Sequence, residues 1–220
     1  MQIFFKILIF LHVFAGCSAL ITGALAMIYK SQTPKHRIAG KVYFWNMTFI
    51  FVSGLYLAVH RNSLFFIFIS FFVYHTLISA YRALKLKGLH KGQQPEILDW
   101  AIEIIAGVAN VCFVGFAVYW YTQGRGSDAL IPLVFGLIGS RSVYKNLMRF
   151  RNCPNDPTHW LQTHISGMIG SYIGAITAFL VNQSAHIPIP DVVLWLAPTA
   201  ILTPFIIFEI RKVKKKIPSM

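Results

Sequence analysis

Seven long apolar stretches are the feature of this sequence that most restricts its fold. A helix needs about 20 apolar residues to cross the hydrocarbon core of a bilayer, and each stretch reaches or approaches that length. They cover residues 7–28, 38–59, 64–84, 97–121, 129–147, 160–181 and 192–210. The fifth is the weakest, because it contains Arg141 and Lys145. The pattern predicts an all-α fold, a polytopic transmembrane bundle of seven helices.

The composition excludes most other classes of protein. Hydrophobic residues make up 56% of the 220-residue chain and charged residues 12%, whereas soluble domains carry about 25% charged residues. A chain this apolar is neither intrinsically disordered nor a water-soluble globule. The three cysteines show no paired spacing, so neither a disulfide framework nor a cysteine-based zinc site is expected. We expect residues 1–220 to form a single transmembrane domain.

The cations of the chain predict its orientation. Three of the 20 Lys and Arg residues, Lys6, Arg61 and Arg125, fall at one side of the predicted bundle, and the other seventeen fall at the opposite side. Because Lys and Arg concentrate in cytoplasmic loops, we expect the N-terminus outside and the C-terminus in the cytoplasm. We expect the protein's partners to be the lipid bilayer and the anionic lipid headgroups at its cytoplasmic face, which the excess of Lys and Arg would contact. Nucleic acid is not an expected partner.

Ionisable residues inside the apolar stretches mark the candidate site, since charge within the membrane is costly and usually functional. His75, Glu103, Arg141 and His164 come from four different stretches. At about 1.5 Å of rise per residue, each lies about 9–14 Å from the predicted cytoplasmic end of its helix. We expect these side chains to converge in one layer, with Glu103 and Arg141 as an ion pair. Other polar residues on the same helical stripes are Ser79, Arg82, Asp99 and Asn110.

Three kinds of function are compatible with such a layer. The favoured one is a cofactor or metal, haem or a transition metal, bound by His75 and His164 in the cytoplasmic half of the bundle, with Glu103 orienting a ligand. At most one haem fits, with Arg141 near a propionate. The second is a small transporter or proton-coupled carrier. The third is a structural or accessory membrane subunit, in which the layer only locks the helices together.

Four further residues are secondary candidates for the site: His12, His36, Arg37 and His159. His36 and Arg37 begin the second predicted helix at the membrane surface, where basic residues also serve as anchors to lipid headgroups. A metal-dependent hydrolase is less consistent with the sequence, because the spacing of His159 and His164 is not the HxxxH of seven-helix hydrolases. Whether the chain is an enzyme, a homo-oligomer or part of a membrane complex is left open by the sequence.

Two segments near the N-terminus resemble a known family. They are His12-Val-Phe-Ala-Gly16, followed by Gly23, and His36-Arg37-Ile-Ala-Gly40-Lys-Val-Tyr43. This HxxxG…G…HRxxGxVY pattern is similar to that of a bacterial family of multi-helix membrane proteins, a domain of unknown function. The resemblance covers residues 12–60 and, more loosely, residues 159–180. It implies a multi-pass protein of the bacterial cytoplasmic (inner) membrane and brings no activity with it.

Overall fold

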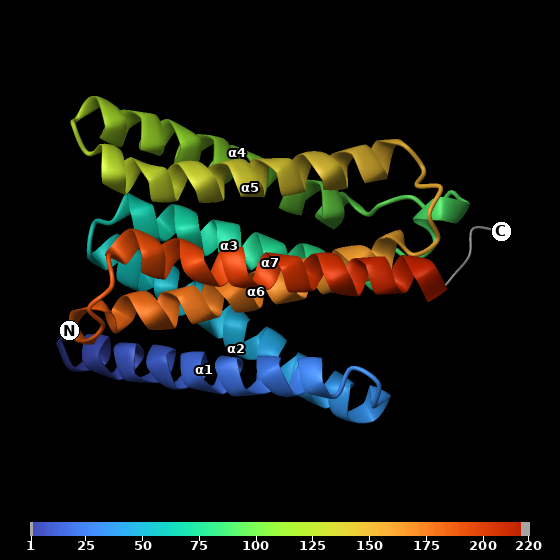
Figure 1. The fold of residues 1–220 in the computed structure, drawn as a ribbon, viewed down its shortest axis with the longest axis horizontal. Coiled ribbons are helices and arrows are strands. Elements are labelled where there is room, and N and C mark those ends of the chain that lie inside the picture. The colour runs from blue at the N-terminus through green and yellow to red at the C-terminus, as the bar shows by residue number, and fades with distance from the viewer. Residues whose placement is uncertain (1, 217–220) are drawn as a thin grey trace.

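The computed structural model describes residues 2–216, and these form seven long helices joined by short connections (Figure 1). The all-α fold predicted from the apolar stretches is therefore confirmed, and the part of the chain in view contains no β-strand. The long helices are α1 (Gln2–Ile28), α2 (Thr33–His60), α3 (Leu64–Ala83), α4 (Ile97–Thr122), α5 (Gly126–Arg151), α6 (His159–Asn182) and α7 (Asp191–Lys216). Two short 3₁₀ turns, η1 (Leu89–Lys91) and η2 (Ser184–His186), lie in the connections.

Six of the helices are long and apolar enough to cross a membrane, with mean hydropathy between 1.5 and 2.1 over their best windows. The exception is α5, which has 26 residues but carries the charges that weaken its apolar stretch. It nevertheless packs along the length of α4. Many large apolar side chains point outward, among them Phe10 and Ile21 of α1, as expected where lipid replaces water around a bundle. The protein is a multi-pass membrane protein.

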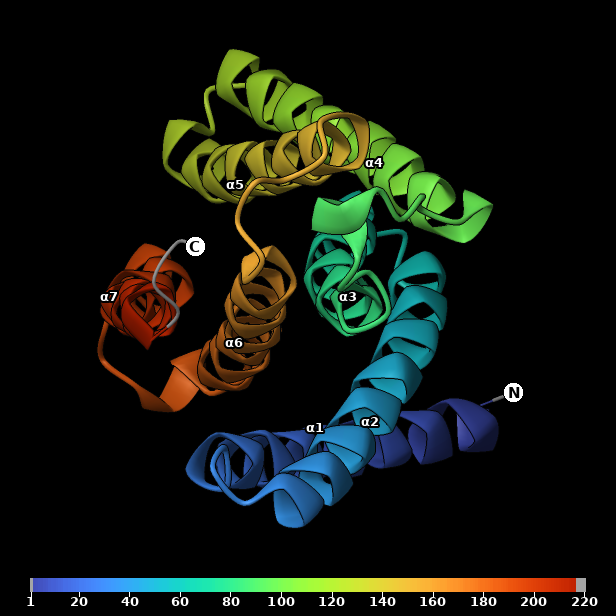
Figure 2. The same ribbon diagram turned by 90° about the vertical axis from the view of Figure 1, so that its right-hand side faces the viewer.

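Helix α3 occupies the middle of the bundle (Figure 2). It contacts α2, α4, α5 and α6, whereas α1 packs mainly on α2 and α7 mainly on α6. A side chain of α3 can therefore meet partners from several helices. This position makes α3 the element on which the polar residues of the predicted layer are assembled.

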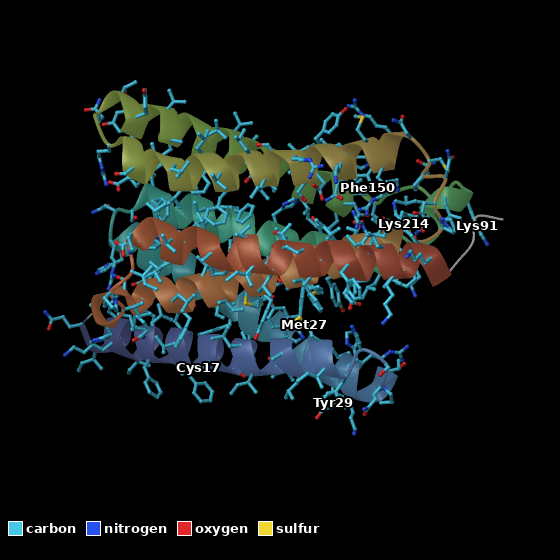
Figure 3. The ribbon with its side chains drawn as sticks, viewed as in Figure 1. Cys17, Met27, Tyr29, Lys91, Phe150 and Lys214 are labelled. Atoms are coloured by element: carbon cyan, nitrogen blue, oxygen red, sulfur yellow. The ribbon has the colours of Figure 1, made fainter. Side chains whose placement is uncertain are left out.

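The cations gather at one end of the bundle, which we call the basic end. It comprises the α1–α2, α3–α4 and α5–α6 connections and the C-terminal part of α7 (Figure 1). Lys91 and Lys214 both lie there (Figure 3). An ion pair of 2.7 Å between Lys30 Nζ and Glu209 Oε1 also links the ends of α1 and α7 at this end.

The helix order gives a direct test of membrane orientation. Reporter fusions at Arg61, Arg125 and Ala185 are expected to read as periplasmic, because these positions lie in the cation-poor connections. Fusions after Arg151 and after Lys216 are expected to read as cytoplasmic. A cytoplasmic reading at Ala185 would contradict the seven-span arrangement, because it requires one span to be lost.

Candidate functional site

The carboxylate of Glu103 is the centre of a buried polar cluster between α3, α4 and α5. Its Oε2 lies 2.9 Å from His75 Nε2, and its Oε1 accepts hydrogen bonds of 2.8 Å from Ser79 Oγ and from Asn146 Nδ2. Glu103 and His75 are each 2% exposed. The expected meeting of His75 with Glu103 is thus present in the structure, and three polar side chains surround the buried carboxylate.

A second buried carboxylate lies one helical turn closer to the basic end. Asp99 accepts two hydrogen bonds from the guanidinium of Arg82, from Nε at 2.7 Å and from Nη2 at 2.9 Å. The same Nη2 donates to the exposed Glu96 at 2.8 Å. Glu96 and Asp99 also cap the first turn of α4 reciprocally. This forked geometry is the strong form of an arginine–carboxylate pair, and it fixes α3 to the beginning of α4.

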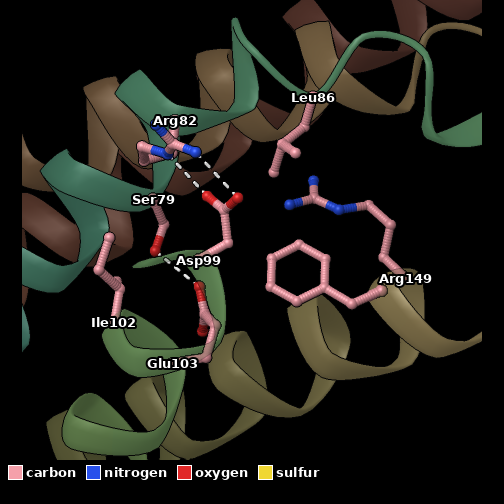
Figure 4. A pocket seen from close by; sticks show the side chains of 8 residues that line it. Ser79, Arg82, Leu86, Asp99, Ile102, Glu103 and Arg149 are labelled. Atoms are coloured by element: carbon pink, nitrogen blue, oxygen red, sulfur yellow. Dashed lines mark hydrogen bonds and ion pairs between the residues drawn. The ribbon is translucent and has the colours of Figure 1, made fainter. Parts of the chain in front are cut away.

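A small cavity separates these two carboxylates from Arg149 of α5 (Figure 4). Its volume is about 10 Å³, which is close to the minimum that holds one water molecule. The guanidinium of Arg149 points toward Asp99 from the opposite wall of the cavity. It donates to Thr163, but its buried Nε has no protein partner. One ordered water would therefore find charged groups on both sides.

The prediction of an ion pair between Glu103 and Arg141 is wrong. Arg141 is exposed, and the α5 residue that contacts Glu103 is Asn146. Five residues along a helix correspond to a rotation of about 140°, so the two α5 side chains point to different sides. The α5 arginine nearest the cluster is the partly buried Arg149, which lines the cavity and lies nearer the basic end than Arg141.

His164 lies apart from the Glu103 cluster and faces His36 of α2. The centroids of the two imidazole rings are 6.3 Å apart, with an angle of 76° between the ring planes. The Nδ1 of His36 lies 2.8 Å from the carbonyl oxygen of Ala26, and the Nδ1 of His164 lies 3.2 Å from that of Ala80. The structure therefore separates His164 from His75 and brings it to His36, a residue considered only as a secondary candidate.

The other secondary candidates lie elsewhere. The Nδ1 of His12 is 2.8 Å from Ser53 Oγ, in the half of the bundle away from the basic end. Arg37 is exposed beside His36. His159 is buried, and its ring centroid lies 5.8 Å from that of His90. Within residues 2–216, no group of three or more His, Cys, Asp or Glu side chains is arranged to hold a metal ion.

The comparison with family models identifies the chain. A family described as predicted membrane protein (DUF2306) matches residues 9–148. The chain belongs to the DUF2306 family. The match includes the HxxxG and HRxxGxVY segments and the three residues that hydrogen-bond to Glu103, and it ends before α6, which carries His164. Searches among curated proteins and among solved structures found no match for the chain. The function of DUF2306 is unknown, so membership confirms the predicted resemblance and supplies no activity.

Proposed function

We propose that this membrane protein binds one haem group through His36 and His164, near the basic end of the bundle. The observation that carries the proposal is the hydrogen bonding of the two imidazole rings. Each Nδ1 is held by a backbone carbonyl, Ala26 O for one ring and Ala80 O for the other. This leaves each Nε2 with a free lone pair, which a metal requires. Metal-ligating histidines usually have this arrangement, with the other ring nitrogen donating to a hydrogen-bond acceptor.

The separation of the two rings agrees with ligation of one metal atom. Bonds between imidazole nitrogen and a metal are about 2.0–2.1 Å long, so two Nε2 atoms on opposite sides of one atom lie about 4 Å apart. Each ring centroid lies about 1 Å further out, which gives a separation of about 6 Å between centroids. The observed 6.3 Å between the His36 and His164 rings matches this value.

Haem fits this pair better than a bare metal ion does. A zinc or copper(II) site usually takes three or four ligands from the protein, and the described residues offer no such group. Haem iron already has four nitrogen ligands from the macrocycle and needs axial ligands alone. A methyl group built on Gly40, one turn beyond His36, would meet nothing within 4 Å, so the surface of α2 is open at this position.

His36 and His164 would hold the haem between them, and the group would then supply electron-transfer chemistry. Ligation by both histidines would leave no open position on the iron for oxygen or a substrate. Exposed Arg37, next to His36, forms no ion pair within the described residues and is available to a propionate carboxylate. We therefore propose an electron-transfer role in the bacterial cytoplasmic membrane, with the basic end facing the cytoplasm and its anionic lipid headgroups.

The test is the visible spectrum of the protein purified from membranes of cells supplied with a haem precursor. A Soret band with the reduced spectrum of a bis-histidine haem is expected, at about one haem per chain. His36→Ala and His164→Ala should each reduce the haem content at least tenfold. His186→Ala is the matched control, because this exposed histidine lies at the opposite end of the bundle and should leave the spectrum unchanged.

Two results would overturn the proposal. One is a colourless wild-type protein that remains folded and takes up no added haemin. The other is a haem spectrum that survives in both His36→Ala and His164→Ala, which would place the ligands elsewhere. A third outcome is a colourless protein with stoichiometric copper or zinc that His36→Ala and His164→Ala remove. That result would show that the histidine pair binds a bare metal ion and not haem.

A further inference from the structure

The pair formed by Glu103 and His75 is buried between α3 and α4, and its hydrogen-bonding groups are incompletely satisfied. The side chains of Glu103 and His75 are 2% and 1% exposed. The carboxylate has three polar partners, but the buried Nδ1 of His75 has none. A histidine that served only to lock two helices together would be expected to have both ring nitrogens satisfied, since an unpaired buried polar atom is destabilising.

A line of carboxylates joins this pair to the water at the basic end. Asp99 is one turn from Glu103 on the same face of α4, and Glu96 is about one turn further. Burial falls along this line, because Asp99 is 2% exposed and the side chain of Glu96 is 66% exposed. The distance covered is about 10 Å at 1.5 Å per residue. The cavity of about 10 Å³ adjoins both buried carboxylates, so one water can bridge them.

On the side of the pair that faces away from the basic end, aromatic side chains pack closely. Phe72, one turn beyond His75 on α3, packs in a core cluster with Phe113, Phe135 and Trp195. Phe113 is completely buried. Along α4, the next buried polar side chain beyond Glu103 is Asn110, about two turns away.

We infer that Glu103 and His75 form a proton-binding site that exchanges protons with the aqueous phase at the basic end. The groups facing Glu103 are His75, Ser79 and Arg82 from α3, Asp99 from α4, and Asn146 and Arg149 from α5. With His75 neutral, two carboxylates and two guanidinium groups balance within this cluster. An added proton would sit on the unpaired Nδ1 of His75 or on a carboxylate oxygen, and it would leave one net positive charge in the cluster.

The experiment is an infrared difference titration of the protein reconstituted in lipid vesicles. On acidification the wild type is expected to show a change in a buried carboxylate band together with an imidazole band. Glu103→Gln keeps the size of the side chain and should remove the carboxylate signal and shift the imidazole signal. Glu209→Gln is the matched control, because Glu209 is paired with Lys30 outside the cluster. Identical spectral changes in wild type and Glu103→Gln would overturn the inference.

A milder substitution keeps the test decisive if Glu103→Gln does not fold. Ser79→Ala removes one of the donors to the carboxylate. Because the hydrogen bond to Oε1 is lost, the acid-induced carboxylate band of this variant should differ in frequency from that of the wild type. Identical acid-induced bands in Ser79→Ala and the wild type, or no acid-induced band in the wild type, would show that the cluster is a fixed lock without proton exchange.

Discussion

Replacing Arg82 by methionine is expected to lower the free energy of unfolding by about 3–5 kcal/mol, because it leaves a buried carboxylate without its counter-charge. Arg82 is 6% exposed and Asp99 is 2% exposed. Two hydrogen bonds of 2.7 and 2.9 Å join them, and the cluster offers Asp99 no second guanidinium in contact. Reversible unfolding by denaturant in mixed micelles measures the change.

Two further variants separate this buried pair from its exposed neighbour. Glu96→Gln removes the surface partner of the same guanidinium and should cost no more than about 1 kcal/mol, as exposed ion pairs do. Combining Arg82→Met with Asp99→Leu removes both buried charges, so the double variant should be more stable than Arg82→Met alone. Equal losses in Arg82→Met and Glu96→Gln would contradict the assignment of the buried pair as the stabilising one.

The depth of each polar residue could be predicted from the sequence, because depth depends on the rise per residue alone. His75 and Glu103 do meet, as that calculation suggested. Which helices are neighbours depends on side-chain packing across the whole bundle, and a single sequence gives no measure of it. His164 illustrates the difference. It lies on α6, where it bonds to Ala80 of α3 through Nδ1 and turns its ring toward His36.

The rotation of α5 was the other feature that could not be predicted. The sequence pairs Glu103 with Arg141 because the two residues have opposite charges at similar depth, but depth carries no information on the direction in which a helix is turned. The structure instead uses Asn146 for the direct contact and keeps Arg149 across the cavity. In the structure Gly139 of α5 lies directly against the side chain of Asn110 on α4, where a larger residue would clash.

Gly167→Ala is expected to destabilise the bundle by about 1–3 kcal/mol, the usual cost of overpacking. A Cβ atom at this position would lie 2.5 Å from the backbone oxygen of Thr76 and 2.6 Å from Ala80 Cβ. A backbone oxygen cannot turn aside, so α3 and α6 must separate. Close approach of helix backbones at small residues is a main source of stability in membrane bundles. The same unfolding measurement applies.

Gly170→Ala is the matched control for the α3–α6 contact, and it also connects stability to the proposed haem site. Its Cβ atom would lie 3.9 Å from Thr76 Cβ, an ordinary contact, so this variant should be neutral or slightly more stable because alanine favours the helix. The carbonyl that orients His164 belongs to Ala80, the residue that an alanine at 167 would displace. Gly167→Ala should therefore weaken haem binding as well as folding, whereas Gly170→Ala should leave both intact. Equal behaviour of the two variants would show that α3 and α6 do not pack as closely as this geometry requires.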